Sequence, residues 1–342
     1  MSRQLHLNLF LMARGHHEGA WRHPGANPKA VTDLELYVDA ARIAENAKFD
    51  AVFLADTLVG PENSQLVASG LLEPITLLTA LALKTERIGL IGTASTTYSH
   101  PYTLARQFAT LDHISKGRAG WNIVTSWAPK AGENYGLAEN VDHADRYRIA
   151  QEFVEAVDAL WRSFPASSIV DDAASGQFLD IGQVRPAGYA GQHIRTRGPL
   201  NVPGSPQGRP VLVQAGQSED GRAFAAKWAE AIFTAHGHKE SAQAFYADVK
   251  SRAVALGRRP QAAGYRDPAG AQRRNWLHGI RGQAGVGRAG CPDQHPGRVR
   301  PPFCSLWRAR LLRLATRSTP HAGRFPRSEP GAGLQEPRGR VR

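Results

Sequence analysis

Residues 210–218, with the sequence PVLVQAGQS, join a short apolar strand (210–213) to an Ala-rich helix that begins near Glu219. A Gly/Ser turn between a strand and a helix N-terminus can bind an anion, because the free N–H groups of the first helical turn and the helix dipole point toward it. The Ser218 hydroxyl can add a further donor. Two interpretations stay open: the turn holds a cofactor phosphate, or Ser218 only caps the helix.

Outward from this turn, apolar strands alternate with amphipathic helical segments from residue 4 to residue 234. The expected strands are residues 5–10, 51–55, 88–93, 119–125, 210–213 and 231–234. Apolar residues recur at helical spacing between them, for example at Leu104, Phe108 and Leu111. This alternation predicts an α/β fold with a parallel sheet and crossover helices, a (β/α)8 TIM-like barrel. Six units are visible before residue 260, and a closed barrel needs eight.

The composition changes after residue 260. Residues 261–342 hold sixteen arginines, no lysine and four acidic residues, which gives the segment the +12 charge of the whole chain and leaves residues 1–260 neutral. Twelve glycines and nine prolines interrupt any periodic pattern there, so we expect a disordered tail and no compact domain. Three origins stay open: GC-rich coding DNA read out of frame, a basic nucleic-acid-binding arm, or an ordinary mobile domain.

Targeting and redox signals are weak throughout the chain. Met1 is followed by no apolar leader, and no apolar run approaches the roughly 18 residues of a membrane span, so we expect a cytoplasmic protein. Cys291 and Cys304 both lie in the tail and lack the spacing of a zinc site or a disulfide framework.

The exits of the first three strands carry polar side chains, and in a βα barrel functional groups lie at these ends. The loop 14–18 contains His16, His17 and Glu18, but its spacing is not His-Glu-x-x-His, so it faces substrate or packs locally rather than binding metal. Asp56 either accepts ligand N–H groups or caps the next segment. The hydroxyl-rich run 93–98 could line a polar ring system.

Further candidates follow the fourth strand. Asn122 lies within an otherwise apolar strand, and a buried amide must be hydrogen-bonded, either to protein or to ligand. His143 and Tyr147 are four residues apart, which places them on one face of a helix that begins near Asp142. Two interpretations stay open for this pair. Both side chains reach a phosphate or the edge of a flavin, or they form a purely structural pair.

Together these segments resemble the flavin-dependent monooxygenases of the bacterial luciferase superfamily, in the branch of nitrilotriacetate, EDTA, dibenzothiophene-sulfone and pristinamycin monooxygenases. The resemblance covers residues 1 to about 260. It rests on many short motifs in the same order, namely LHLN (5–8), GHHE (15–18), WRHP (21–24), FDAVFLAD (49–56), LEP (72–74), TASTTY (93–98), RAGWNIVTS (118–126), HADRY (143–147) and the Ser218 turn.

The resemblance implies a luciferase-type barrel that binds reduced FMN, supplied by a separate NAD(P)H:flavin reductase. Reduced FMN and O2 would form a C4a-(hydro)peroxide that inserts one oxygen atom into a small organic substrate. It also implies a homo-oligomer without a metal site, with His16 or His17 facing substrate. The implied FMN-binding residues are Asp56, Thr93, Thr97, Asn122, His143, Tyr147 and Ser218.

The chain departs from this family after residue 260, where relatives continue for about a hundred or more residues. The last two barrel strands are therefore expected to be missing or scrambled, which would leave sheet edges unpaired. An active oxygenase component and a truncated, inactive derivative both fit the sequence. Two other readings stay open, a deazaflavin-dependent oxidoreductase of the same superfamily and a non-catalytic flavin- or nucleic-acid-binding remnant.

Overall fold

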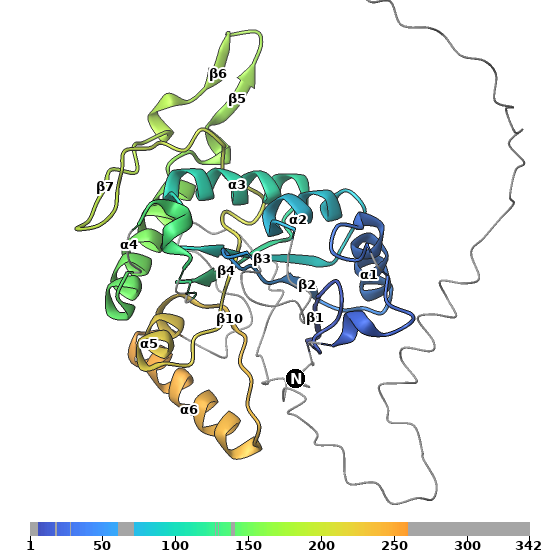
Figure 1. Ribbon diagram of the computed structural model, residues 1–342. Coiled ribbons are helices and arrows are strands. Elements are labelled where there is room, and N and C mark those ends of the chain that lie inside the picture. Colours follow the sequence, from blue (N-terminus) through green and yellow to red (C-terminus); the bar gives the residue numbers. More distant parts are fainter. Residues whose placement is uncertain are drawn as a thin grey trace, which may run out of the picture. The chain divides into compact units, whose positions relative to one another are not determined.

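The computed structural model describes residues 6–17, 19–27, 29–60, 72–126, 128, 130–137 and 141–258 (Figure 1). All of them belong to the first of two compact units, Met1–Gly287, and the second unit, Arg288–Arg342, lies outside the described residues. The predictions for Leu5, Glu18, the tail 261–342 and the last two barrel strands also fall outside them. The boundary expected near residue 260 therefore stays a prediction.

A six-stranded parallel sheet with the order β1-β2-β3-β4-β9-β10 forms the centre of the described structure. Its strands are β1 (Asn8–Phe10), β2 (Ala51–Leu54), β3 (Gly89–Ser95), β4 (Ala119–Val124), β9 (Val211–Gln214) and β10 (Ala231–Ile232). These strands confirm the six predicted from the apolar runs. The end of β3 lies two residues beyond the prediction, at Ser95, and β10 ends before Thr234.

Helices follow the strands and cover the outer side of the sheet, with α2 and α3 above it in Figure 1. They are α1 (Leu34–Asn46), α2 (Pro74–Ala82), α3 (Pro101–Ile114), α4 (His143–Arg162), α5 (Glu219–Trp228) and α6 (Lys239–Ala255). Proline stands at the start of α2 and α3, where its missing N–H costs no hydrogen bond. Asp142 caps α4 through the Ala144 N–H.

The looser segment 165–209 projects between α4 and β9 as two small hairpins (Figure 1). Its elements are η3 (Ala166–Ser168), β5 (Ile169–Asp172), β6 (Gln177–Leu179), η4 (Ile181–Gln183), β7 (Tyr189–Ala190) and β8 (Arg195–Thr196). The Glu152 carboxylate on α4 accepts the N–H groups of Gln192, His193 and Ile194 at 3.1, 2.7 and 2.9 Å. These three bonds attach the second hairpin to α4.

Side chains alternate between the two faces of the sheet. Trp121 and Ile123 point to the helix layer and pack with the main core, which contains Phe108 and Phe153. The opposite, inner face carries a separate apolar cluster of Ala51, Phe53, Ile91, Val213 and Ala231. Because side chains alternate along a strand, Asn122 lies on this inner face.

Three phenylalanines extend the inner face across β1, β2 and the residue after β10. The ring centroids of Phe10 and Phe53 are 5.1 Å apart, and those of Phe53 and Phe233 are 5.9 Å apart. They make one side of the sheet aromatic and apolar. Among the described helices, none combines the length and the apolar character that crossing a bilayer requires.

Candidate functional site

The α5 N-terminus lies at the exit of β9, as the 210–218 stretch predicts. Ser218 is the N-cap residue, and its Oγ accepts the Gly221 N–H at 3.1 Å. Ser218 therefore does cap α5. Anion binding by the same turn stays a prediction, and capping does not exclude it, because Oγ retains a proton that it can donate.

The turn packs directly against Tyr147, which leaves room only for glycine at two positions. A Cβ placed on Gly216 or on Gly221 would lie 2.9 Å from the Tyr147 hydroxyl, and the one on Gly216 would lie closer still to Gln214 Nε2. His143 and Tyr147 lie together as their spacing predicts, with ring centroids 5.2 Å apart. The Tyr147 hydroxyl, the Gln214 amide and the His143 imidazole therefore lie around the backbone of this turn.

Two carboxylates share this helix start. Glu219 pairs with Arg222 Nη2 at 2.5 Å and with Arg252 Nη1 at 2.6 Å, so its charge is neutralised. Asp220 lies 3.4 Å from His143 Nδ1, and both side chains are half exposed. Asp220 occupies the positive end of the helix dipole in this structure. Ser218, Tyr147 and His143 each carry a group that can donate a hydrogen bond to an anion.

Asp56 follows β2, and its Oδ1 accepts the N–H of Thr57 at 2.8 Å. Burial raises the pKa of Asp56 above its ordinary value and nearby Glu73 adds to the rise, while the Thr57 N–H acts in the opposite direction. Tyr135, in the 3-10 helix η2 (Gly132–Tyr135), stacks on Tyr98 with centroids 4.8 Å apart. Burial, followed by the charge of Asp56, raises the pKa of Tyr135.

The hydroxyls of the 93–98 run are engaged with backbone. Thr93 Oγ1 donates to the Leu54 carbonyl at 2.8 Å, and Thr97 Oγ1 donates to the Thr125 carbonyl at 2.9 Å. Asn122 Nδ2 donates to Thr93 Oγ1 at 2.9 Å, whereas the buried Asn122 Oδ1 has no partner among the described residues. The Thr93–Asn122 contact follows from the register of β3 against β4.

The histidines of the first loop have different surroundings. His16 lies edge-on to the Phe10 ring at 4.7 Å, and its Nε2 is 3.2 Å from the Phe10 carbonyl. His17 Nδ1 accepts the Gly19 N–H at 3.0 Å, so it closes a local turn. Glu18 is outside the described residues. Within the described chain, no three His, Cys, Asp or Glu side chains gather where they could hold a metal ion.

Three residues of this region lie in the quoted stretches of sequence but were not singled out as candidates. Ser95 Oγ accepts the Thr97 and Tyr98 N–H groups and the Ser126 hydroxyl, which fixes the turn after β3. Arg146 Nη1 donates to the Ser126 carbonyl at 2.9 Å and so connects α4 to the β4 exit. Gln214, the last residue of β9, lies beside Gly216 with a buried Oε1 that has no described partner.

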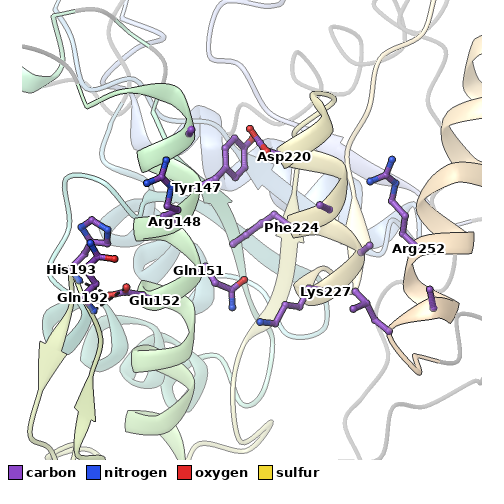
Figure 2. Close-up of a pocket in the computed structure, with 15 residues that line it drawn as sticks. Tyr147, Arg148, Gln151, Glu152, Gln192, His193, Asp220, Phe224, Lys227 and Arg252 are labelled. Carbon is purple, nitrogen blue, oxygen red and sulfur yellow. Dashed lines mark hydrogen bonds between the residues drawn. The ribbon is translucent and has the colours of Figure 1, made fainter.

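A groove of about 750 Å³ lies between α4, α5 and α6 beside the second hairpin (Figure 2). Figure 2 shows Tyr147 and Asp220 near one end and Glu152 and His193 toward the other. It therefore meets the candidate site only at Tyr147 and Asp220. The remaining lining comes from α4, α5, α6 and the second hairpin, outside the inner face of the sheet, so this groove is not the position where the strand-end residues converge.

The sequence matches the luciferase-like monooxygenase family over residues 10–268. It is 46% identical over 259 residues to N-acetyl-S-(2-succino)cysteine monooxygenase of Bacillus subtilis (76% of this chain, 59% of that one). It is 44% identical over 269 residues to nitrilotriacetate monooxygenase component A of Aminobacter aminovorans (75% and 59%). The crystal structure of riboflavin lyase with modified FMN and riboflavin superposes with a TM-score of 0.68 at 36% identity (75% and 60%).

The chain belongs to the luciferase-like monooxygenase family, a family of enzymes, and has its α/β fold. The resemblance inferred from the motifs is therefore confirmed. The chain spans 59% of the length of both curated relatives.

Proposed function

We propose that this chain is the oxygenase component of a two-component flavin-dependent monooxygenase. It binds reduced FMN, delivered by an NAD(P)H:flavin reductase, and acts on a small organic substrate as a homo-oligomer. The observation that carries the proposal is the glycine-only turn against Tyr147 with Ser218 at the start of α5. Support comes from a relative named as component A and from the similarity to riboflavin lyase, whose crystal structure contains modified FMN.

In this proposal the FMN phosphate binds at the start of α5. The Ser218 and Tyr147 hydroxyls and the His143 imidazole donate to its oxygens, together with the free N–H groups of the first turn. His143 Nδ1 is already 3.4 Å from a carboxylate oxygen of Asp220, so an anion at that position has a geometry that the ring accepts. The phosphate and the Asp220 carboxylate compete for His143. The free N–H groups at the start of α5 stabilise either anion.

The strand ends would hold the flavin ring. Asp56, Thr93, Thr97 and Asn122 are the polar groups that orient it, and bound reduced FMN supplies the activation of O2. The Phe10, Phe53 and Phe233 rings make the adjacent inner face apolar, and apolar surroundings would limit the access of water to the reacting atoms. His16 lies on Phe10, and we place it, with His17, on the substrate side.

Isotope labelling tests this function. The chain is supplied with a flavin reductase, NADH, FMN and ¹⁸O2, and with N-acetyl-S-(2-succino)cysteine and nitrilotriacetate as separate trial substrates. We expect one ¹⁸O atom in an organic product, detected by mass spectrometry, and no product when FMN is left out. If flavin binds but all labelled oxygen leaves as peroxide and water with every substrate, the chain is not an oxygenase.

A further inference from the structure

We propose that the groove between α4, α5 and α6 binds the adenosine monophosphate half of FAD, so that the chain takes FAD as well as FMN. This inference rests on the proposed function, because it starts from a flavin phosphate at the start of α5. The groove meets that position at Tyr147 and Asp220 and continues from there along α4 and α5 (Figure 2). FAD is FMN with an adenylate attached to its phosphate, so its second half would extend from that position into the groove.

Tyr147 belongs to both the phosphate turn and the groove. Its hydroxyl faces the turn, since a Cβ placed on Gly216 or Gly221 would lie 2.9 Å from it. Its ring packs edge-on against Phe224 in the groove wall, with ring centroids 6.0 Å apart. The groove is therefore the adjoining space for a ligand that continues beyond the phosphate.

The size and the walls of the groove suit an adenosine. Its volume of about 750 Å³ lies within the range of about 300–1,000 Å³ that is usual for small-molecule sites. Apolar side chains from all three helices contribute to the lining, namely Ala144, Ala223, Phe224, Ala226, Ala255 and Leu256. Such a surface can pack against the face of a planar base.

The two carboxylates of the lining are engaged within the protein. Glu152 accepts the three N–H groups that attach the second hairpin to α4. Asp220 lies 3.4 Å from His143 Nδ1. Lys227 and Arg252 add positive charge to the same lining, which favours an anionic ligand.

Arg148 is the side chain best placed for the second phosphate of FAD, because it lines the groove and directly follows Tyr147 on α4. Its Nη1 lies 2.9 Å from Asp145 Oδ1, and its side chain is 65% exposed. A guanidinium carries five N–H groups, so Arg148 can donate to a phosphate while it keeps this ion pair.

Ala223→Phe tests the groove directly, because Ala223 is exposed on α5 and lines it. Dissociation constants of FMN and FAD are measured by titration followed by flavin fluorescence. Wild type should bind FAD at least as tightly as FMN. In the variant the phenyl ring occupies the space of the adenylate, so FAD should bind about tenfold more weakly while FMN binding stays unchanged. Ala247→Phe is the matched control, since Ala247 is exposed on α6 outside the groove lining.

Arg148→Gln tests the charge, and it replaces Ala223→Phe if the larger side chain impairs folding. It should weaken FAD binding about two- to fivefold, the scale of an exposed ion pair, and leave FMN binding unchanged. Arg162→Gln is its matched control. Arg162 also lies on α4, is 62% exposed and pairs with Asp158, but it is not part of the groove lining.

The ratio of the FMN and FAD affinities decides between the outcomes. Wild type that binds FMN but not FAD would overturn this inference and leave the proposed function in place. The same ratio in wild type, Ala223→Phe and Arg148→Gln would overturn it as well. Failure of wild type to bind FMN at all would instead refute the proposed function, and this inference with it.

Discussion

Trp121→Ala should lower the free energy of unfolding by about 3–5 kcal/mol, because truncating a fully buried Trp loses transfer energy and leaves a cavity. Trp121 is 0% exposed, and its ring lies 5.9 Å from that of Phe108 and 6.1 Å from that of Phe153. The indole N–H also donates to the Ala94 carbonyl at 3.1 Å, and the substitution removes that hydrogen bond. Urea unfolding followed by circular dichroism measures the loss.

Phe178→Ala is the matched control, since it removes another aromatic ring from a different environment. Phe178 lies on β6 and is 62% exposed. Exposed positions that lack a special structural role change stability by about 0.5 kcal/mol or less. Similar losses in the two variants would contradict the packing described between the sheet and the helices.

Gly216→Ala should weaken FMN binding, because the added methyl group is forced into a packed site, at a cost of about 1–3 kcal/mol to the folded turn. The new Cβ would lie 2.9 Å from the Tyr147 hydroxyl and 3.0 Å from the Gly221 Cα. Tyr147 and the start of α5 must separate to accommodate it. The donors proposed for the phosphate then no longer converge on one point. Titration of FMN followed by flavin fluorescence measures the change.

Gly237→Ala is the control for this substitution, because a Cβ on Gly237 meets no atom within 4 Å. It should leave the FMN dissociation constant unchanged. If Gly216→Ala also binds FMN as tightly as wild type, the turn at the β9 exit does not hold the flavin phosphate.

Local sequence signals accounted for most of the described fold. The six strands followed from apolar runs, and the helices from 3.6-residue spacing, because each pattern reports the burial of one face. Capping by Ser218 was one of two interpretations of its position before Glu219, and the structure has that bond. The hairpins β5–β6 and β7–β8 were not predicted, since their short strands are largely exposed and carry no alternating apolar pattern.

Contacts between segments that are distant in the sequence were harder to predict from the sequence. The sequence predicts that Asn122 needs a hydrogen-bond partner. That this partner is Thr93 depends on the register of β3 against β4, which no local pattern specifies. Gln214 gives no individual signal, because a polar residue at the end of a strand is common. Tyr147 approaches Gly216 only because α4 packs beside α5. Most of the site is therefore non-local in origin.

The central claim is that the start of α5 binds the phosphate of FMN. The most direct test compares the dissociation constants of FMN and riboflavin, which differ only in that phosphate, for wild type and for Ser218→Ala. Hydrogen bonds to a charged group contribute about 1.5–3 kcal/mol each, so wild type should bind FMN at least tenfold more tightly than riboflavin. Ser218→Ala should lose about 1–2 kcal/mol of FMN binding and leave riboflavin binding unchanged. Equal affinities of wild type for the two flavins, or equal losses for both in Ser218→Ala, would contradict it.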